Sequence, residues 1–139
     1  MNWKNNCLHK LAPATIASLN KLKEATHVSL PTEYYELLSF TNGGEWELAV
    51  QPYLFISDST ETVSDAIKSK DYEEFFPGFI MIGSNGAGEF ISLDIRQIQP
   101  YPVVAIDMTN SDLSETVLII AESFQSFLKL LGTRSPELD

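Results

Sequence analysis

The sequence contains few of the residues that carry metal binding or covalent catalysis. It has a single cysteine, Cys7, and two histidines, His9 and His27. One thiol cannot form a disulfide within the chain, and we expect it to stay reduced in the cytosol. Structural zinc needs four Cys or His ligands, and a Ser or Cys nucleophile needs a neighbouring base. The sequence therefore predicts no metal, no cofactor and no catalytic residues. An enzyme would have to use two acidic side chains for general acid–base catalysis, and no spacing in the sequence singles out such a pair.

Long apolar stretches are also missing. No run approaches the roughly 18 residues that suggest a membrane helix. The first seven residues are polar and lack the apolar core of a secretion signal. A length of 139 residues with 44% hydrophobic residues suits one globular domain. We therefore expect a cytoplasmic protein with one domain over residues 1–139 and no membrane partner.

Basic residues are scarce, with 9 Lys+Arg against 19 Asp+Glu and a net charge of −10. The acidic excess is concentrated in residues 45–74, which hold eight acids and two lysines. Phosphate backbones and anionic lipids repel such a chain, so the composition argues against nucleic-acid binding. A basic protein partner would be attracted by the same field. The alternative is that the acidic residues serve only solubility.

The periodicity of apolar residues and the positions of Pro and Gly predict an α+β fold. Helices are expected over Pro13–Ala25, Pro31–Thr41, Glu61–Phe75 and Glu122–Leu131. Strands are expected over residues 46–50, 53–56, 79–82, 89–95, 103–108 and 116–120. In the first helix Ile16, Leu19 and Leu22 should face inward, and Thr60 is a candidate cap for the third. This order indicates one domain whose largely antiparallel central sheet is flanked by N-terminal and C-terminal helices.

The glycine-rich stretch Gly83–Gly88 is the candidate for a phosphate site. Its spacing is neither G-x-G-x-x-G nor a P-loop ending in Lys-Ser/Thr. It also leads into a predicted strand, so no helix N-terminus is offered to an anion. The stretch is therefore interpreted as a hairpin turn between the two strands.

Several motifs together resemble the SUKH superfamily, over about residues 10–132. The first is Leu30-Pro31-Thr32-Glu33-Tyr34-Tyr35-Glu36-Leu37-Leu38, followed by Thr41-Asn42-Gly43-Gly44. The later ones, in the same order as in that superfamily, are Phe76–Gly83, Gly86–Asp94, Pro102–Asp107 and Ile120–Leu128. One departure is the turn Ser84-Asn85-Gly86-Ala87-Gly88-Glu89, where relatives more often have an Asp-Gly-Gly-Gly-Asp type of sequence. No role is carried over to the acidic residue of this turn.

The superfamily groups bacterial immunity proteins of contact-dependent and other polymorphic toxin systems with fungal cell-wall-assembly regulators. The resemblance implies an immunity protein that binds and neutralises a cognate protein toxin, with no catalytic residues to carry over. A nuclease toxin is often basic, and an acidic inhibitor can mimic its phosphate substrate. The alternatives are a scaffold or regulator bound to a housekeeping partner and, in a different class, a small enzyme.

The partner-binding face is expected to mix acidic residues with aromatic anchors. The residues predicted for it are Glu45, Trp46, Glu47, Tyr53, Asp71, Tyr72, Glu73 and Glu74. Strand alternation leaves a second interpretation open for Trp46 and Tyr53, as part of the sheet core. For the acidic residues the alternative is a solvated surface.

Overall fold

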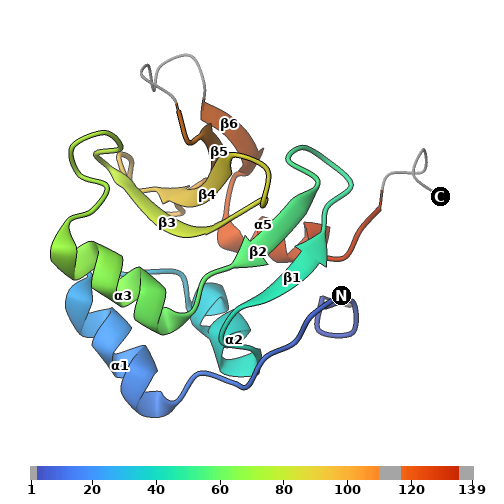
Figure 1. Ribbon diagram of the computed structural model, residues 1–139, viewed down its shortest axis with the longest axis horizontal. Helices are drawn as coiled ribbons and strands as arrows, with labels where there is room; N and C mark the ends of the chain where they lie inside the picture. The colour runs from blue at the N-terminus through green and yellow to red at the C-terminus, as the bar shows by residue number, and fades with distance from the viewer. Residues whose placement is uncertain (1–2, 110–116, 135–139) are drawn as a thin grey trace.

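The helices and strands appear in the expected order in the computed structural model, which describes residues 3–109 and 117–134 (Figure 1). The helices are α1 (Ile16–Ala25), α2 (Thr32–Phe40), α3 (Thr60–Ser69) and α5 (Phe124–Leu130). The strands are β1 (Gly44–Glu47), β2 (Leu54–Ser57), β3 (Phe79–Ser84), β4 (Glu89–Asp94), β5 (Val103–Asp107) and β6 (Val117–Ala121).

All six strands join one sheet in the order of the sequence, and every neighbouring pair is antiparallel. The register shifts between Met81 and Gly83 and between Val103 and Val104, and such bulges increase the local twist. The sheet is curled, with helices flanking it (Figure 1). The predicted α+β fold with an antiparallel central sheet is confirmed.

Hydroxyl side chains set three of the helix starts. Thr15, Ser59 and Ser123 each accept a hydrogen bond from the backbone N–H three residues further on, at 3.1 Å in each case. Such a bond satisfies one of the donors that the first turn of a helix leaves unpaired. The predicted start at Pro13 is therefore wrong by three residues. The predicted cap Thr60 is also wrong, since it is the first residue of α3.

The core lies between the helices and the inner face of the sheet. Its largest side chains are aromatic and fully buried, and their rings meet at centroid distances of 5.4 Å for Tyr34–Phe124 and 5.0 Å for Phe55–Phe127. Leu22 of α1 is buried as predicted, whereas Ile16 is 78% exposed. Ile16 begins the helix, before the turn that reaches the core, so its expected inward position is wrong.

The opposite face of the sheet is covered by the segment between α3 and β3. Phe79, Met81, Val104 and Ile106 form a second hydrophobic cluster there, closed by Phe76. A third helix was predicted to run to Phe75, but α3 ends at Ser69 because Lys70 adopts the left-handed conformation, with φ 57°. The next residues turn back onto the sheet, so tertiary packing overrides the continuing helical pattern.

Candidate protein-binding site

The eight residues predicted for a binding face fall into two groups that lie apart in the fold. One group, on β1 and the β1–β2 hairpin, consists of Glu45, Trp46, Glu47 and Tyr53. The other group lies in the segment after α3 and consists of Asp71, Tyr72, Glu73 and Glu74. Figure 1 shows the hairpin at the right of the molecule and the α3–β3 segment at the left. The acidic stretch that is continuous in the sequence is thus divided between two sides of the protein.

Trp46 is a core residue. Its side chain is 0% exposed, and the ring stacks on Phe55 with a centroid distance of 5.9 Å and an interplanar angle of 19°. The indole Nε1–H donates a hydrogen bond of 2.7 Å to the buried backbone oxygen of Trp3. Strand alternation points this side chain inward, as the second interpretation of Trp46 required. Trp46 is therefore no longer assigned to a partner-binding face.

The outer edge of β1 is covered by segments from both ends of the described chain. The backbone N–H of Leu8 donates to the oxygen of Glu45, and that of Gly132 donates to the oxygen of Glu47, both at 2.8 Å. The Glu47 carboxylate also forms an ion pair of 3.0 Å with Arg134. Tyr53 is 50% exposed in the hairpin loop, so it is not part of the sheet core. The β1 group thus offers one exposed aromatic ring, the half-buried carboxylate of Glu45, and the carboxylate of Glu47, whose charge Arg134 matches.

The segment between α3 and β3, residues 70–78, is a folded loop; we call it the acidic loop. Backbone hydrogen bonds from Asp71 to Ala66 at 3.2 Å and from Phe76 to Tyr72 at 2.8 Å hold its turns. Three carboxylates in this loop are exposed, and none of them forms an ion pair with another residue in the described parts of the chain. These carboxylates belong to Asp71, Glu73 and Glu74. Their negative charge is therefore directed to solvent.

Aromatic rings fasten the acidic loop to the sheet. Tyr72 and Phe76 both meet Phe90 of β4 in edge-to-face geometry, with centroid distances of 5.2 Å and 5.4 Å. Burial raises the pKa of the Tyr72 hydroxyl, and the charges of Asp58 and Asp71 raise it further. Tyr72 is half-buried. The predicted anchor Tyr72 therefore orders the loop and leaves only part of its ring for a partner.

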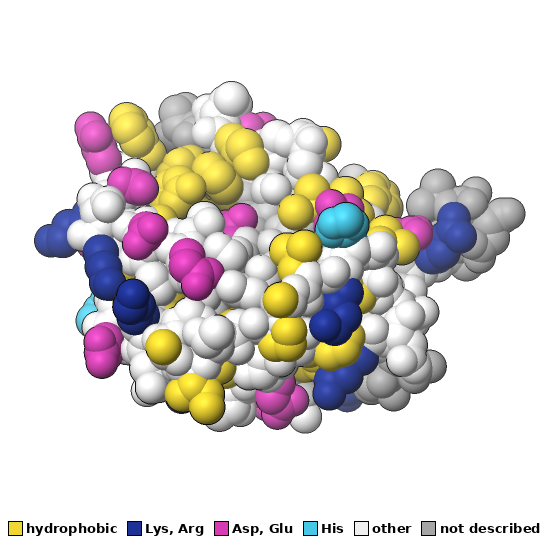
Figure 2. All heavy atoms as spheres, turned by 60° about the horizontal axis from the view of Figure 1, so that its bottom comes forward, with side chains coloured by type: hydrophobic (Ala, Val, Ile, Leu, Met, Phe, Trp, Pro, Cys, Tyr) yellow, Lys and Arg dark blue, Asp and Glu magenta, His cyan; other side chains and the backbone are white. Residues whose placement is uncertain are grey.

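Sequence reasoning missed Phe75, which stands in the acidic loop directly after Glu73 and Glu74. Its side chain is 65% exposed. The Glu-Glu-Phe-Phe pattern was a usable signal, but it was interpreted as the end of a helix. Figure 2 shows acidic and hydrophobic side chains at the left of the molecule, the side on which the loop lies in Figure 1, together with Lys or Arg side chains at the same edge. The loop thus combines exposed carboxylates with an exposed aromatic ring.

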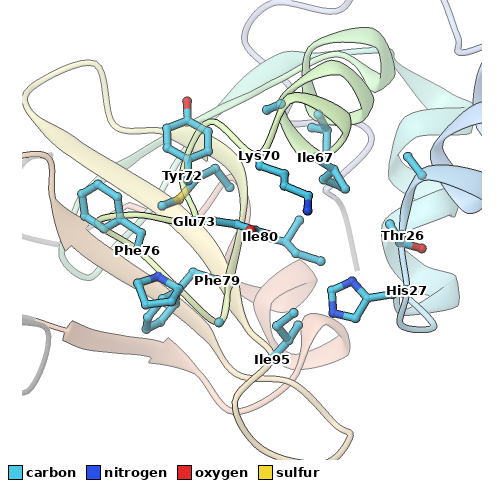
Figure 3. Close-up of a pocket in the computed structure, with 16 residues that line it drawn as sticks. Thr26, His27, Ile67, Lys70, Tyr72, Glu73, Phe76, Phe79, Ile80 and Ile95 are labelled. Atoms are coloured by element: carbon cyan, nitrogen blue, oxygen red, sulfur yellow. The ribbon is translucent and has the colours of Figure 1, made fainter.

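A cavity of about 390 Å³ opens beside the acidic loop, between the end of α1, α3 and β3. Apolar side chains make most of its wall, including Ile67 of α3 and Ile80 of β3 (Figure 3). Lys70, Glu73 and His27 supply the polar groups, and Figure 3 shows their side chains directed toward the open space above Ile80. A volume of this size falls within the range of pockets that bury a ligand or a side chain of a partner.

A sequence model of the SMI1/KNR4 family (SUKH-1) matches residues 13–130. The chain belongs to this family. Membership confirms the resemblance seen in the motifs and is consistent with a role in toxin immunity, since SUKH domains are generally binding domains rather than enzymes. No curated protein matches the chain.

Within residues 3–109 and 117–134, no three His, Cys, Asp or Glu side chains are grouped so that they could hold a metal ion. In the same residues, no helix has the length and apolar character needed to span a bilayer.

Proposed function

We propose that this SUKH-1 protein is an immunity protein that binds a cognate toxin, of a nuclease type, and neutralises it by stoichiometric association. Family membership supports a binding role directed at a protein such as a toxin. The observation that carries the choice of face is the acidic loop, where three exposed carboxylates precede the exposed ring of Phe75 within five residues of the chain. Interfaces commonly combine an aromatic anchor with a polar rim in this way.

The charge of the chain favours a basic partner. A net charge of −10 produces a negative field, and the acidic loop presents part of it without neutralising cations on the same carboxylates. Attraction between opposite charges on two proteins accelerates their association, and added salt weakens this attraction. A toxin that cleaves nucleic acid carries basic groups for the phosphates, and these groups would meet the acidic loop. Binding there would then exclude the substrate.

The test is co-expression with a candidate toxin domain encoded by a neighbouring gene. We expect the wild-type protein to restore growth and to bind the toxin at a ratio of one to one, more weakly at high salt. Reversal of Asp71, Glu73 and Glu74 to Lys should abolish the rescue and weaken affinity by about tenfold or more, because rim charges act on association and pairing.

A matched variant carries the same change of net charge elsewhere, at the exposed residues Glu36, Asp65 and Glu122. It should retain rescue and most of the affinity, since these residues lie outside the acidic loop. If this variant loses affinity while the acidic-loop variant retains it, the binding face lies outside the acidic loop. Absence of rescue and of binding by the wild-type protein would refute the immunity role and favour a regulatory scaffold.

A further inference from the structure

The cavity beside the acidic loop is a mostly apolar pocket with room for one large apolar group. Ile67, Phe79, Ile80 and Ile95 are among the side chains that line it, and all four are hydrophobic. Its volume of about 390 Å³ exceeds what one Phe or Leu side chain fills, so such a group can enter. Complete burial of such a side chain removes its apolar surface from water and therefore favours binding.

The groups at the mouth of the cavity restrict what can enter it. Lys70 ends α3 in the left-handed conformation, and its side chain extends across the opening toward His27 (Figure 3). Glu73 also lines the cavity and belongs to the acidic loop. Basic groups of an incoming molecule are therefore repelled on the side of Lys70 and attracted on the side of Glu73 and Glu74.

The position of the cavity argues for a protein segment as its occupant. A small apolar molecule would fill the cavity and leave the carboxylates of the acidic loop and the ring of Phe75 unused. A polypeptide can place one apolar side chain in the cavity while its neighbouring basic side chains meet the exposed carboxylates. The carboxylates of the loop and the apolar wall of the cavity would then both contribute to binding of the same partner.

We propose that this cavity receives an aromatic or long aliphatic side chain of the partner, presented by a basic segment whose Lys or Arg residues pair with Glu73 and Glu74. The inference rests on the proposed function for the nature of the partner as a basic protein. It adds the chemistry of the partner's recognition segment. It also makes the cavity wall, rather than the charges alone, a source of specificity.

The experiment uses three short synthetic peptides and the full-length chain, and it does not require the toxin. One peptide has a central Phe between pairs of Lys, the second replaces the Phe with Ser, and the third places the Phe between pairs of Glu. Binding is followed by NMR through the methyl signals of Ile80 and Ile95. We expect the Lys–Phe peptide to bind about tenfold more tightly than the Lys–Ser peptide, a difference of about 1.4 kcal/mol. The Glu–Phe peptide should bind more weakly than the Lys–Phe peptide.

Two variants block the cavity by different routes. Ala66→Phe adds a ring to the cavity wall, and His27→Trp adds one at the exposed mouth. Both should remove the preference for Phe over Ser while leaving the weak, salt-sensitive binding of the basic peptides. Ala17→Phe is the matched control, since it adds the same ring to an exposed helical position outside the cavity, and it should behave as the wild type.

Equal binding of the Phe and Ser peptides, or methyl shifts confined to residues outside the cavity, would overturn the inference. A Phe preference that persists in both blocked variants would overturn it as well. The proposed function is tested separately by neutralisation of the toxin. A protein that rescues growth but shows no Phe preference would keep its immunity role and lose the cavity as a recognition site.

Discussion

Replacing Trp46 with Phe tests whether this residue acts in the core or at a binding face. The indole is fully buried, stacks on Phe55 and donates a hydrogen bond of 2.7 Å to the backbone oxygen of Trp3. Phe keeps an aromatic ring at the position but has no N–H. The substitution therefore removes one buried hydrogen bond and part of one side-chain volume without adding charge or a longer side chain.

The expected loss of stability follows from these two changes. Trp3 is only 7% exposed, so its carbonyl would be left buried without a donor, at a cost of about 1–3 kcal/mol. The smaller ring leaves a space of roughly 40 Å³, and at about 24 cal/mol per Å³ the cavity adds about 1 kcal/mol. The total is about 2–4 kcal/mol, which is a large fraction of the roughly 5–15 kcal/mol that stabilise an ordinary domain.

Urea unfolding followed by circular dichroism at the helix band measures this loss, since tryptophan fluorescence would change with the substitution itself. With a slope of about 1.5 kcal/mol per M, the midpoint should fall by roughly 2 M. Phe75→Leu is the control, because Phe75 is 65% exposed and its replacement should stay within about 0.5 kcal/mol of the wild type. A Trp46→Phe protein with wild-type stability but weakened toxin binding would refute the placement of Trp46 in the core.

Two more predictions concern stability. Gly83→Ala should destabilise the protein by several kcal/mol in the same urea assay, because an added Cβ would lie 2.2 Å from the backbone oxygen of Ile56 on the neighbouring strand. A backbone atom cannot move aside as the end of a side chain can. An alanine variant as stable as the wild type would show that β2 and β3 can separate at low cost. Burial raises the pKa of the Asp58 carboxyl, so the folded state binds a proton more readily than the unfolded state. The contribution of this group to stability therefore falls as the pH rises from about 4, near the unfolded pKa, through the raised pKa of the folded state. Asp58→Asn should therefore raise the melting temperature at neutral pH and have less effect below pH 4, whereas the exposed Asp65→Asn should change it little at either pH; an Asp58→Asn protein that melts lower than the wild type at neutral pH would contradict the sign.

The order of elements and the antiparallel sheet could be predicted because local signals agree with the tertiary structure there. In α2 the apolar face of Tyr34, Leu37 and Leu38 is fully buried, as the spacing predicted. The hairpin between β3 and β4 follows the glycine-rich turn, whose Asn85 side chain accepts hydrogen bonds from two backbone N–H groups in the turn. Where the spacing of apolar residues, the helix caps and the turn residues indicate the same structure, the sequence alone is sufficient to predict that element.

The boundary of α3 could not be predicted in this way. Residues 61–75 keep an amphipathic pattern, and Tyr72, Phe75 and Phe76 continue the aromatic content expected of a helix that packs on a sheet. The chain instead turns at Lys70, and Tyr72 and Phe76 reach the ring of Phe90 on β4. That contact joins residues far apart in the sequence, so a local pattern holds no record of it. The exposure of Phe75 follows from the same turn.

The division of the acidic residues decides which of them can act on a partner. Glu47 faces Arg134 at 3.0 Å, and the backbone groups of its strand are paired with both terminal segments, so its charge and its edge are already engaged. The carboxylates of Glu73 and Glu74 form no ion pair within the described chain and lie beside an exposed ring and an apolar cavity. An acidic side chain without a cation gains most from a basic partner, because no internal pair must first be broken. The sequence alone weighted all these acids equally. The ion pair with Arg134 favours the loop over Glu47, whereas the same argument does not apply to Glu45, which forms no ion pair within the described residues.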